Sequence, residues 1–272
     1  MFNKIKCLRN IRWSAAWCRR AQAGALCGVT LLALLVTGCA STAPGGAPDL
    51  QRLGGAVAVD DARYVRALVE SNAITVNQVI PGAGYTVTPM ITVAARNASI
   101  NVLRFLIAAR ADLNARTPDR DTALMLAAFF GQEEQALNSA SYARYELAVR
   151  LLVEAGASLE NAEINAYTPL GYAAYAGRDN TVRYLLEKGA KVNASTQGGN
   201  SHINTPLMMA ALQGHRNTAL HLLRAGADAR VRVQNGMTAL ELAQKNKQTH
   251  LEKMLRCAET LAAGESFQQR CE

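Results

Sequence analysis

The stretches TPLGYAAYAGRDNTVRYLLEKGAKVNA, residues 168–194, and TPLMMAALQGHRNTALHLLRAGADARV, residues 205–231, are two copies of one pattern. Each copy opens on Thr-Pro-Leu, continues through small residues, and reaches a Leu-Leu pair shortly before a Gly. A Thr hydroxyl can cap a helix and Pro suits the first helical turn, so a short helix is predicted there. Gly189 and Gly226 stand where a second helix would end in a left-handed residue. Each copy is therefore predicted to be a pair of helices.

The opening tripeptide recurs along most of the chain. Its copies start at Thr88, Thr122, Thr168, Thr205 and Thr238, at intervals of 34, 46, 37 and 33 residues, and a degenerate copy begins at Arg63. This pattern resembles the ankyrin repeat family, whose period is about 33 residues, over roughly Val57 to Cys257. The resemblance implies an all-α solenoid of about five to six helix-turn-helix repeats with hairpin loops, in which neighbouring repeats supply the core to one another.

The copies depart from the family in two respects. Asn72 and Arg110 occupy the place that Gly156, Gly189 and Gly226 hold in the other copies. Asn tolerates the left-handed region, whereas Arg110 predicts a small local strain. The family's His after Thr-Pro-Leu is absent from every copy, so the hydrogen bonds that it makes between loops must be replaced or lost.

The first 38 residues differ in composition from the rest. They hold six basic and no acidic residues, and end in the apolar run 24–38. This is typical of a secretory signal peptide, and the run is shorter than the ~20 residues of a membrane span. The segment Leu-Val-Thr-Gly-Cys, residues 35–39, resembles a bacterial lipobox, which implies cleavage after Gly38 and lipid attachment to Cys39. The alternative is a buried apolar helix with a chance Cys.

These features divide the chain into four parts. We expect a signal peptide (1–38), a lipidated Cys39 with a flexible tether (39–54), the repeats (55–257) and a C-terminal cap (258–272). The expected repeat boundaries are about 55–87, 88–121, 122–167, 168–204, 205–237 and 238–257. Ala40 stands where Asp would be the usual inner-membrane retention signal, and this resembles outer-membrane lipoproteins. The expected location is therefore the cell envelope, lipid-anchored on the outer membrane and facing the periplasm.

Charge and motifs exclude several classes of function. The net charge of +8 reduces to +2 beyond residue 38, with 23 basic and 21 acidic residues and no long basic run, so nucleic-acid binding is not expected. The sequence shows no nucleophile elbow, phosphate loop or metal-ligand spacing. We predict a monomeric binding protein with no catalytic residues, cofactor or metal. An enzyme with a site in the concave groove is the alternative class, which no motif supports.

Partner-binding positions follow from the resemblance. Ankyrin partners usually contact the hairpin tips and the end of the first helix of each repeat. Mapped onto this chain, those positions include Phe129, Phe130, Tyr167, Tyr175, His202, Asn204, Gln213, Gln234 and Asn235. The four aromatic residues would be neighbours, and aromatic residues are enriched at interface hot spots. Alternatively, Phe129 or Phe130 turns inward as core.

The expected partner is a protein. A sharper version of this hypothesis is an immunity or inhibitor protein against an antibacterial toxin that acts in the periplasm. The alternative binding role is an envelope scaffold or a stress-protection factor for a periplasmic enzyme.

An insertion and two cysteines complete the chain. The 46-residue copy carries 13 extra residues within 131–146, which predict a helix extension or solvent loop, or else a binding protrusion. After cleavage, Cys257 and Cys271 are the only cysteines besides Cys39. An exported location permits a disulfide between them that pins the tail onto the last helix. The alternative is a buried Cys257 with a loose Cys271.

Overall fold

Residues 47–272 form one compact unit made of helix pairs. The structure is a computed structural model that describes residues 48–82, 85–130, 139–160, 167–194, 205–232, 236–262 and 265–271. Within these ranges the elements are α3 Leu50–Ala58, α4 Ala62–Glu70, β1 Val79–Gly82, β2 Tyr85–Pro89, α5 Met90–Arg96, α6 Ile100–Ala108, α7 Ala123–Phe129, α8 Ser139–Glu154, α9 Pro169–Tyr175, α10 Asp179–Glu187, α11 Pro206–Gln213, α12 Arg216–Arg224, α13 Ala239–Lys245, α14 Thr249–Glu259 and α15 Phe267–Cys271. The predicted all-α solenoid is confirmed.

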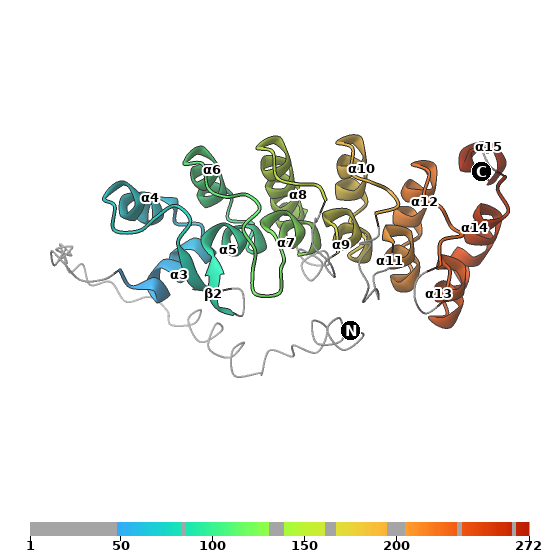
Figure 1. Ribbon diagram of the computed structural model, residues 1–272, viewed down its shortest axis with the longest axis horizontal. Coiled ribbons are helices and arrows are strands. Elements are labelled where there is room, and N and C mark those ends of the chain that lie inside the picture. The colour runs from blue at the N-terminus through green and yellow to red at the C-terminus, as the bar shows by residue number, and fades with distance from the viewer. Residues whose placement is uncertain are drawn as a thin grey trace, which may run out of the picture. The chain divides into compact units, whose positions relative to one another are not determined.

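Stacking of equivalent helices builds the core (Figure 1). The first helices α3, α5, α7, α9, α11 and α13 contact one another in turn, and the second helices α4 to α14 form a parallel row. The first helices bury Ala pairs such as Ala127–Ala128 and Ala173–Ala174, whose small side chains let neighbouring helices approach closely. The second helices bury leucines such as Leu152, Leu185 and Leu222. No single pair could bury this surface alone, so each repeat depends on its neighbours.

The Thr residues that open the copies cap the first helices. The Oγ1 atoms of Thr168 and Thr205 accept hydrogen bonds from the backbone N–H groups of Gly171 (3.1 Å) and Met208 (3.3 Å). Thr122 and Thr238 cap α7 and α13 in the same way. In the copy at Thr88, Pro89 holds the capping position instead.

The second helices end in left-handed residues, as the pattern predicts. Gly156, Gly189 and Gly226 have φ values of 93°, 90° and 88°. Asn72 and Arg110 take the same place with φ values of 57° and 60°. Arg110 therefore holds a conformation that costs a residue with a Cβ atom about 1 kcal/mol or more.

Asparagine side chains link successive repeats on the hairpin-loop side. Asn77 Oδ1 accepts a hydrogen bond from the N–H of Asp112 (2.8 Å), and Asn114 Oδ1 accepts one from Ser158 (3.0 Å). Asn193 Oδ1 continues the series with the N–H of Asp228 (2.9 Å). Successive loops are thus joined by asparagine hydrogen bonds, although the family's His is absent.

The predicted tether, 39–54, is wrong at its C-terminal end. Helix α3 begins at Leu50, and Asp49 Oδ1 caps it by accepting hydrogen bonds from two backbone N–H groups. Leu53 and Val57, four residues apart on one helix face, are fully buried. Gly54 in this helix lies against the Pro81 carbonyl of β1, where a Cβ atom would clash. Its glycine therefore serves close packing.

The hairpin between α4 and α5 is the one sheet among the described residues. Strands β1 and β2 pair antiparallel, with Ile80 opposite Thr88. Both of these side chains are buried, while Val79 and Val87 face outward with exposed fractions of 44% and 55%. The alternation fits a hairpin with one face on the solenoid core.

The insertion lengthens a second helix. Helix α8 has 16 residues, against nine in α6, α10 and α12. Residues 139–146 of the inserted stretch are therefore helical, which favours the interpretation as a helix extension for this part. Residues 131–138 lie outside the described residues.

The C-terminal tail returns to the last repeats. Helix α15 contacts α12 and α14. Cys257 on α14 and Cys271 on α15 form a disulfide, the pairing that the sequence analysis expects. The signal peptide and Cys39 lie outside the described residues.

Candidate protein-binding surface

Five aromatic side chains gather where α7 ends and α9 runs beside it. We call Phe129, Phe130, Tyr167, Tyr172 and Tyr175 the aromatic cluster. Phe129 is its centre, with ring centroids 5.1 Å from Phe130, 5.5 Å from Tyr172 and 6.0 Å from Tyr175. Tyr167 joins through Tyr172, at 5.6 Å. The structure thus brings together the four aromatic residues proposed from sequence.

The cluster is part core and part surface. Tyr175 is buried, with 9% of its area exposed, whereas Phe129, Phe130, Tyr167 and Tyr172 are half-buried. Most contacts between rings are edge-on, a favoured arrangement for aromatic pairs. The rings therefore hold one another in place and keep part of their area available to solvent.

Tyr172 was missed by the sequence analysis. It lies three residues before Tyr175 on α9, so the two side chains share one face of the helix. Its hydroxyl donates a hydrogen bond to Asp121 Oδ1 at 2.7 Å. The helical spacing of Tyr172 and Tyr175 is the signal that would have found it.

Charged and hydroxyl groups frame the cluster. The Arg96 guanidinium lies 4.6 Å above the Phe130 ring centroid, a cation–π contact. Burial, with a smaller contribution from nearby Tyr175, raises the pKa of Tyr167, so its hydroxyl stays protonated at neutral pH. The cluster therefore presents apolar faces with hydrogen-bonding hydroxyls at their edges.

A buried arginine fixes the backbone of the cluster. Arg178 is fully buried, and its Nη2 donates a hydrogen bond to the Phe130 carbonyl at 2.9 Å. Its guanidinium lies 4.3 Å from the ring centroid of Tyr142 and 5.8 Å from that of Tyr145. Burial lowers the pKa of Arg178, while Tyr142 and Glu146 act in the opposite direction. Arginine nevertheless remains protonated in proteins, so Arg178 is a buried cation.

The extended part of α8 contacts the two repeats that precede it. The Tyr145 hydroxyl donates to the Arg96 carbonyl at 3.0 Å, and Arg144 Nη2 donates to the Ala98 carbonyl at 3.0 Å. Arg144 also reaches Asp60, in the first repeat, at 3.5 Å. The extension therefore contacts the preceding repeats through Tyr145 and Arg144, and the following repeat through the rings of Tyr142 and Tyr145 that lie against Arg178.

These contacts belong to a series that spans the solenoid. At four of the five junctions, a side chain at or near the start of a second helix binds a carbonyl at the end of the preceding first helix. Arg178 is one of these donors. The others are Ser99, which binds the Ala58 carbonyl (3.4 Å), His215, which binds the Tyr175 carbonyl (3.1 Å), and His250, which binds the Gly214 carbonyl (2.8 Å). At the junction of α5 and α7, Tyr145 of the lengthened α8 binds the Arg96 carbonyl. Burial lowers the pKa of His215, so its ring is neutral at neutral pH. His215 thereby holds the backbone of Tyr175, another member of the cluster.

Of the remaining predicted positions, the structure describes Gln213. Gln213 is the last residue of α11 and is half-buried. His202, Asn204, Gln234 and Asn235 lie outside the described residues.

Neither a membrane-spanning helix nor a metal-binding group is found among the described residues. No helix in these ranges is both long enough and apolar enough to cross a membrane. In the same ranges, no three His, Cys, Asp or Glu side chains lie close enough together to hold a metal ion.

Comparison with known families agrees with the repeat pattern. Residues 132–196 match the family described as ankyrin repeats (3 copies), and residues 172–224 match that described as ankyrin repeats (many copies). The two matches together span residues 132–224, which is most of the insertion-bearing repeat and of the two repeats after it. The search of curated proteins returned no match to this chain.

Proposed function

We propose that this ankyrin-repeat solenoid is a lipid-anchored envelope protein that captures another protein on its aromatic cluster. Ankyrin repeats favour a protein–protein interaction scaffold. The observation that carries the proposal is the group of four half-buried rings on two adjacent repeats. Aromatic residues contribute strongly to interfaces because they bury much area with few rotatable bonds.

The surroundings of the cluster suit it to binding. Arg178 and His215 hold the backbones of Phe130 and Tyr175, and Arg96 covers one ring face. Because the rings are already packed against one another, little side-chain freedom remains to be lost when a partner binds. Such preorganisation lowers the entropic cost of association.

The anchor and the partner form the finer part of the proposal. The lipobox-like segment ending at Cys39 supports attachment to the envelope membrane, and Ala40 supports the outer membrane facing the periplasm. An anchored binding scaffold in that compartment suits an immunity or inhibitor protein against a periplasm-acting antibacterial toxin. A single such partner, present in stoichiometric amount, is expected.

A matched pair of variants tests the surface. Phe130 and Phe105 are both half-buried, and each lies beneath an arginine, at 4.6 Å from Arg96 and 5.3 Å from Arg66. Phe105 lies on α6, outside the cluster. In pull-downs from detergent-solubilised envelope with the anchored protein as bait, Phe130→Ala should lose the partner and Phe105→Ala should keep it. Equal capture by both variants would contradict the proposed surface, provided both retain the wild-type far-UV spectrum.

The anchor has its own test. The variant Cys39→Ser should abolish incorporation of labelled palmitate and move the protein from the membrane to the soluble fraction. Partner binding by purified Cys39→Ser should remain intact, since the aromatic cluster is unchanged. Labelling that persists in this variant would contradict lipid attachment at Cys39.

A further inference from the structure

The Cys257–Cys271 disulfide is the main tie between the tail and the solenoid. Helix α15 has five residues, of which Phe267 is the buried one, with 5% of its area exposed. The ion pair of Arg270 with Glu265 (2.6 Å) and the hydrogen bond from Ala262 to Glu265 (2.7 Å) both lie within the tail. They stabilise the tail's own conformation and do not fasten it to α12 or α14. Among the described contacts, that task falls to Phe267 and the disulfide, with a long hydrogen bond from Arg230 Nη1 to the Leu261 carbonyl (3.5 Å) where the tail begins.

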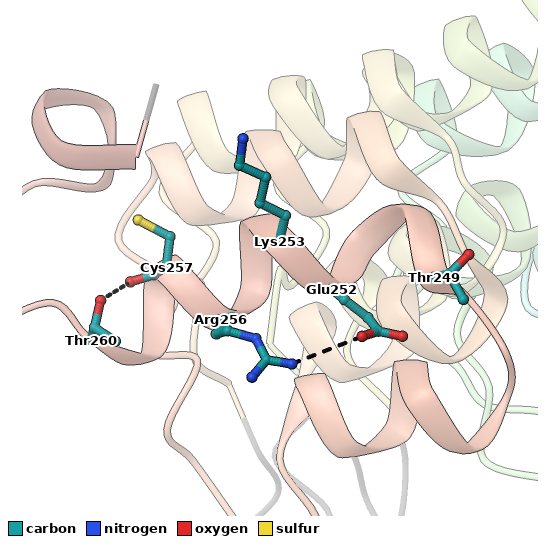
Figure 2. Close-up of a pocket in the computed structure, with 6 residues that line it drawn as sticks. All are labelled: Thr249, Glu252, Lys253, Arg256, Cys257 and Thr260. Carbon is teal, nitrogen blue, oxygen red and sulfur yellow. Dashed lines mark hydrogen bonds and ion pairs between the residues drawn. The ribbon is translucent and has the colours of Figure 1, made fainter.

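Cys257 is placed where a reductant can reach it. It lines an open surface depression on α14 together with Thr249, Glu252, Lys253, Arg256 and Thr260 (Figure 2). Figure 2 shows the Lys253 and Cys257 side chains leaving α14 on the same side, one turn apart, whereas Arg256 turns toward Glu252. The Arg256–Glu252 ion pair spans 3.9 Å.

The charge of this depression favours an anionic attacking group. Two cations, Lys253 and Arg256, face one carboxylate, Glu252, so the lining is positive by one charge. A thiolate is the nucleophile in thiol–disulfide exchange. Nearby cations attract an incoming thiolate and stabilise the thiolate that forms at the cysteine.

From this placement we propose that Cys257–Cys271 is a thiol–disulfide exchange site, opened by a dithiol reductant, whose opening releases α15 from α12 and α14. The reductant thiolate attacks Cys257 Sγ and forms a mixed disulfide, and the Cys257–Cys271 bond breaks. Its electron pair leaves on Cys271 Sγ, which takes a proton from water. The second thiol of the reductant then loses its proton and attacks the reductant sulfur that is bonded to Cys257 Sγ. Cys257 leaves as a thiolate, which takes up a proton, and the reductant becomes an intramolecular disulfide.

Release of the tail follows from its size. A five-residue helix is not stable without tertiary support, because the cost of its first turn is not recovered. Once the covalent tie is cut, a single buried ring must hold the whole segment. Phe267 then leaves its site, and the surface of α12 and α14 that α15 covers becomes accessible. This inference goes beyond the proposed function and depends on neither the anchor nor the partner.

The test uses dithiothreitol on the full chain. Alkylation followed by peptide mass spectrometry reports the thiols at residues 257 and 271, and hydrogen exchange reports protection along the chain. Reduction should leave the far-UV helical signal intact, speed amide exchange in residues 265–271 at least tenfold, and leave α5 to α11 unchanged. The proposal is overturned if the disulfide is reduced only when the whole solenoid unfolds, or if α15 stays protected after reduction.

Variants separate the two parts of the proposal. Cys257→Ser combined with Cys271→Ser should reproduce the fast exchange of the tail without reductant. Should that variant fail to fold, reduction of the wild-type chain still decides the matter by the same exchange readout. Lys253→Gln should slow reduction by dithiothreitol about threefold or more at low salt, and the effect should shrink at high salt. The control is Lys245→Gln, an exposed cation on α13; equal rates for the two variants would refute the role of the depression.

Discussion

Arg178 allows the sharpest test of how the repeats are coupled. We predict that Arg178→Met destabilises the solenoid and weakens the junction between the α7–α8 and α9–α10 pairs. Methionine can fill the space of the arginine stem, because it is unbranched and flexible. It cannot donate a hydrogen bond to the Phe130 carbonyl or offer a cation to the Tyr142 ring. The substitution therefore removes the hydrogen bond and the cation–π contacts at one junction with little loss of volume.

The expected magnitude follows from those two kinds of interaction. A hydrogen bond to a charged group contributes roughly 1.5–3 kcal/mol, and a desolvated cation–π contact contributes about 2 kcal/mol. Burying methionine instead of a charged group offsets part of this lost free energy, since removing a buried cation relieves its desolvation cost. We expect a net loss of about 2–3 kcal/mol in the free energy of unfolding. In a solenoid, where each repeat contacts only its neighbours, such a loss falls on one interface.

Urea unfolding provides the measurement. Arg178→Met should lower the midpoint and reduce the cooperativity of the transition, because the N-terminal and C-terminal repeats become less tightly coupled. Arg183→Met is the matched control: it lies on the same helix, α10, but its side chain is exposed. A surface substitution of this kind should change the free energy of unfolding by no more than about 0.5 kcal/mol. Equal stabilities for the two variants would refute the role given to the buried arginine.

Three further outcomes are expected. Arg110→Gly should stabilise the solenoid by about 0.5–1 kcal/mol in thermal or urea unfolding, because its φ of 60° suits glycine; a decrease would contradict the assigned strain. Gly177→Ala, at φ 66° with its new Cβ 2.6 Å from the His215 ring, should cost about 2–3 kcal/mol, against about 1 kcal/mol for Gly189→Ala, which meets no atom within 4 Å. Burial lowers the pKa of His215, so as the pH falls this residue binds a proton in the unfolded chain before it does so in the folded chain. The free energy of unfolding should therefore fall as the pH drops below about 6.5. His215→Gln should flatten that dependence of the melting temperature on pH, and an unchanged slope would exclude His215 as its source.

Local signals account for the parts of the fold that sequence predicted. A Thr that accepts a hydrogen bond from the third residue of a helix acts within one turn, so Thr168 and Thr205 could be assigned from their neighbours alone. The left-handed ends at Asn72 and Arg110 were equally readable, because the repeat fixes the backbone at that place whatever residue occupies it. These assignments need no knowledge of distant contacts.

Elements that depend on distant contacts were harder to predict. Residues 50–54 end in Gly54, the first of two adjacent glycines, and follow a Pro/Gly-rich stretch, so the sequence places them in the tether. The Asp49 cap and the spacing of Leu53 and Val57 were present as helix signals, but only the close approach of Pro81 explains Gly54. Burial of Arg178 was also unpredictable, because its partners Phe130 and Tyr142 belong to the preceding repeat and its insertion.

The junction contacts explain why a repeat pattern says little about the binding surface. Ser99, Arg178 and His215 occupy one position, immediately before α6, α10 and α12, and each binds a carbonyl of the preceding repeat. Serine, arginine and histidine can all occupy this position, because stacking fixes where the carbonyl lies and a donor of suitable length is enough to reach it. Which of these residue types is present therefore depends on the side chains around it. Irregular residues therefore mark the places where something beyond stacking shapes the chain.

Those irregularities meet at one junction. The fully buried Arg178 and the aromatic cluster lie where the α7–α8 and α9–α10 pairs meet, and the Arg178 guanidinium lies over Tyr142 and Tyr145 of the α8 extension. Stacking alone would be served by small and aliphatic residues, as it is at Ala210 and Leu222 in the following repeat. A chain that instead places a buried cation beneath half-buried rings incurs a desolvation cost that packing does not require. Deviations of this kind are expected at functional sites, and this is the physical reason for placing the partner there.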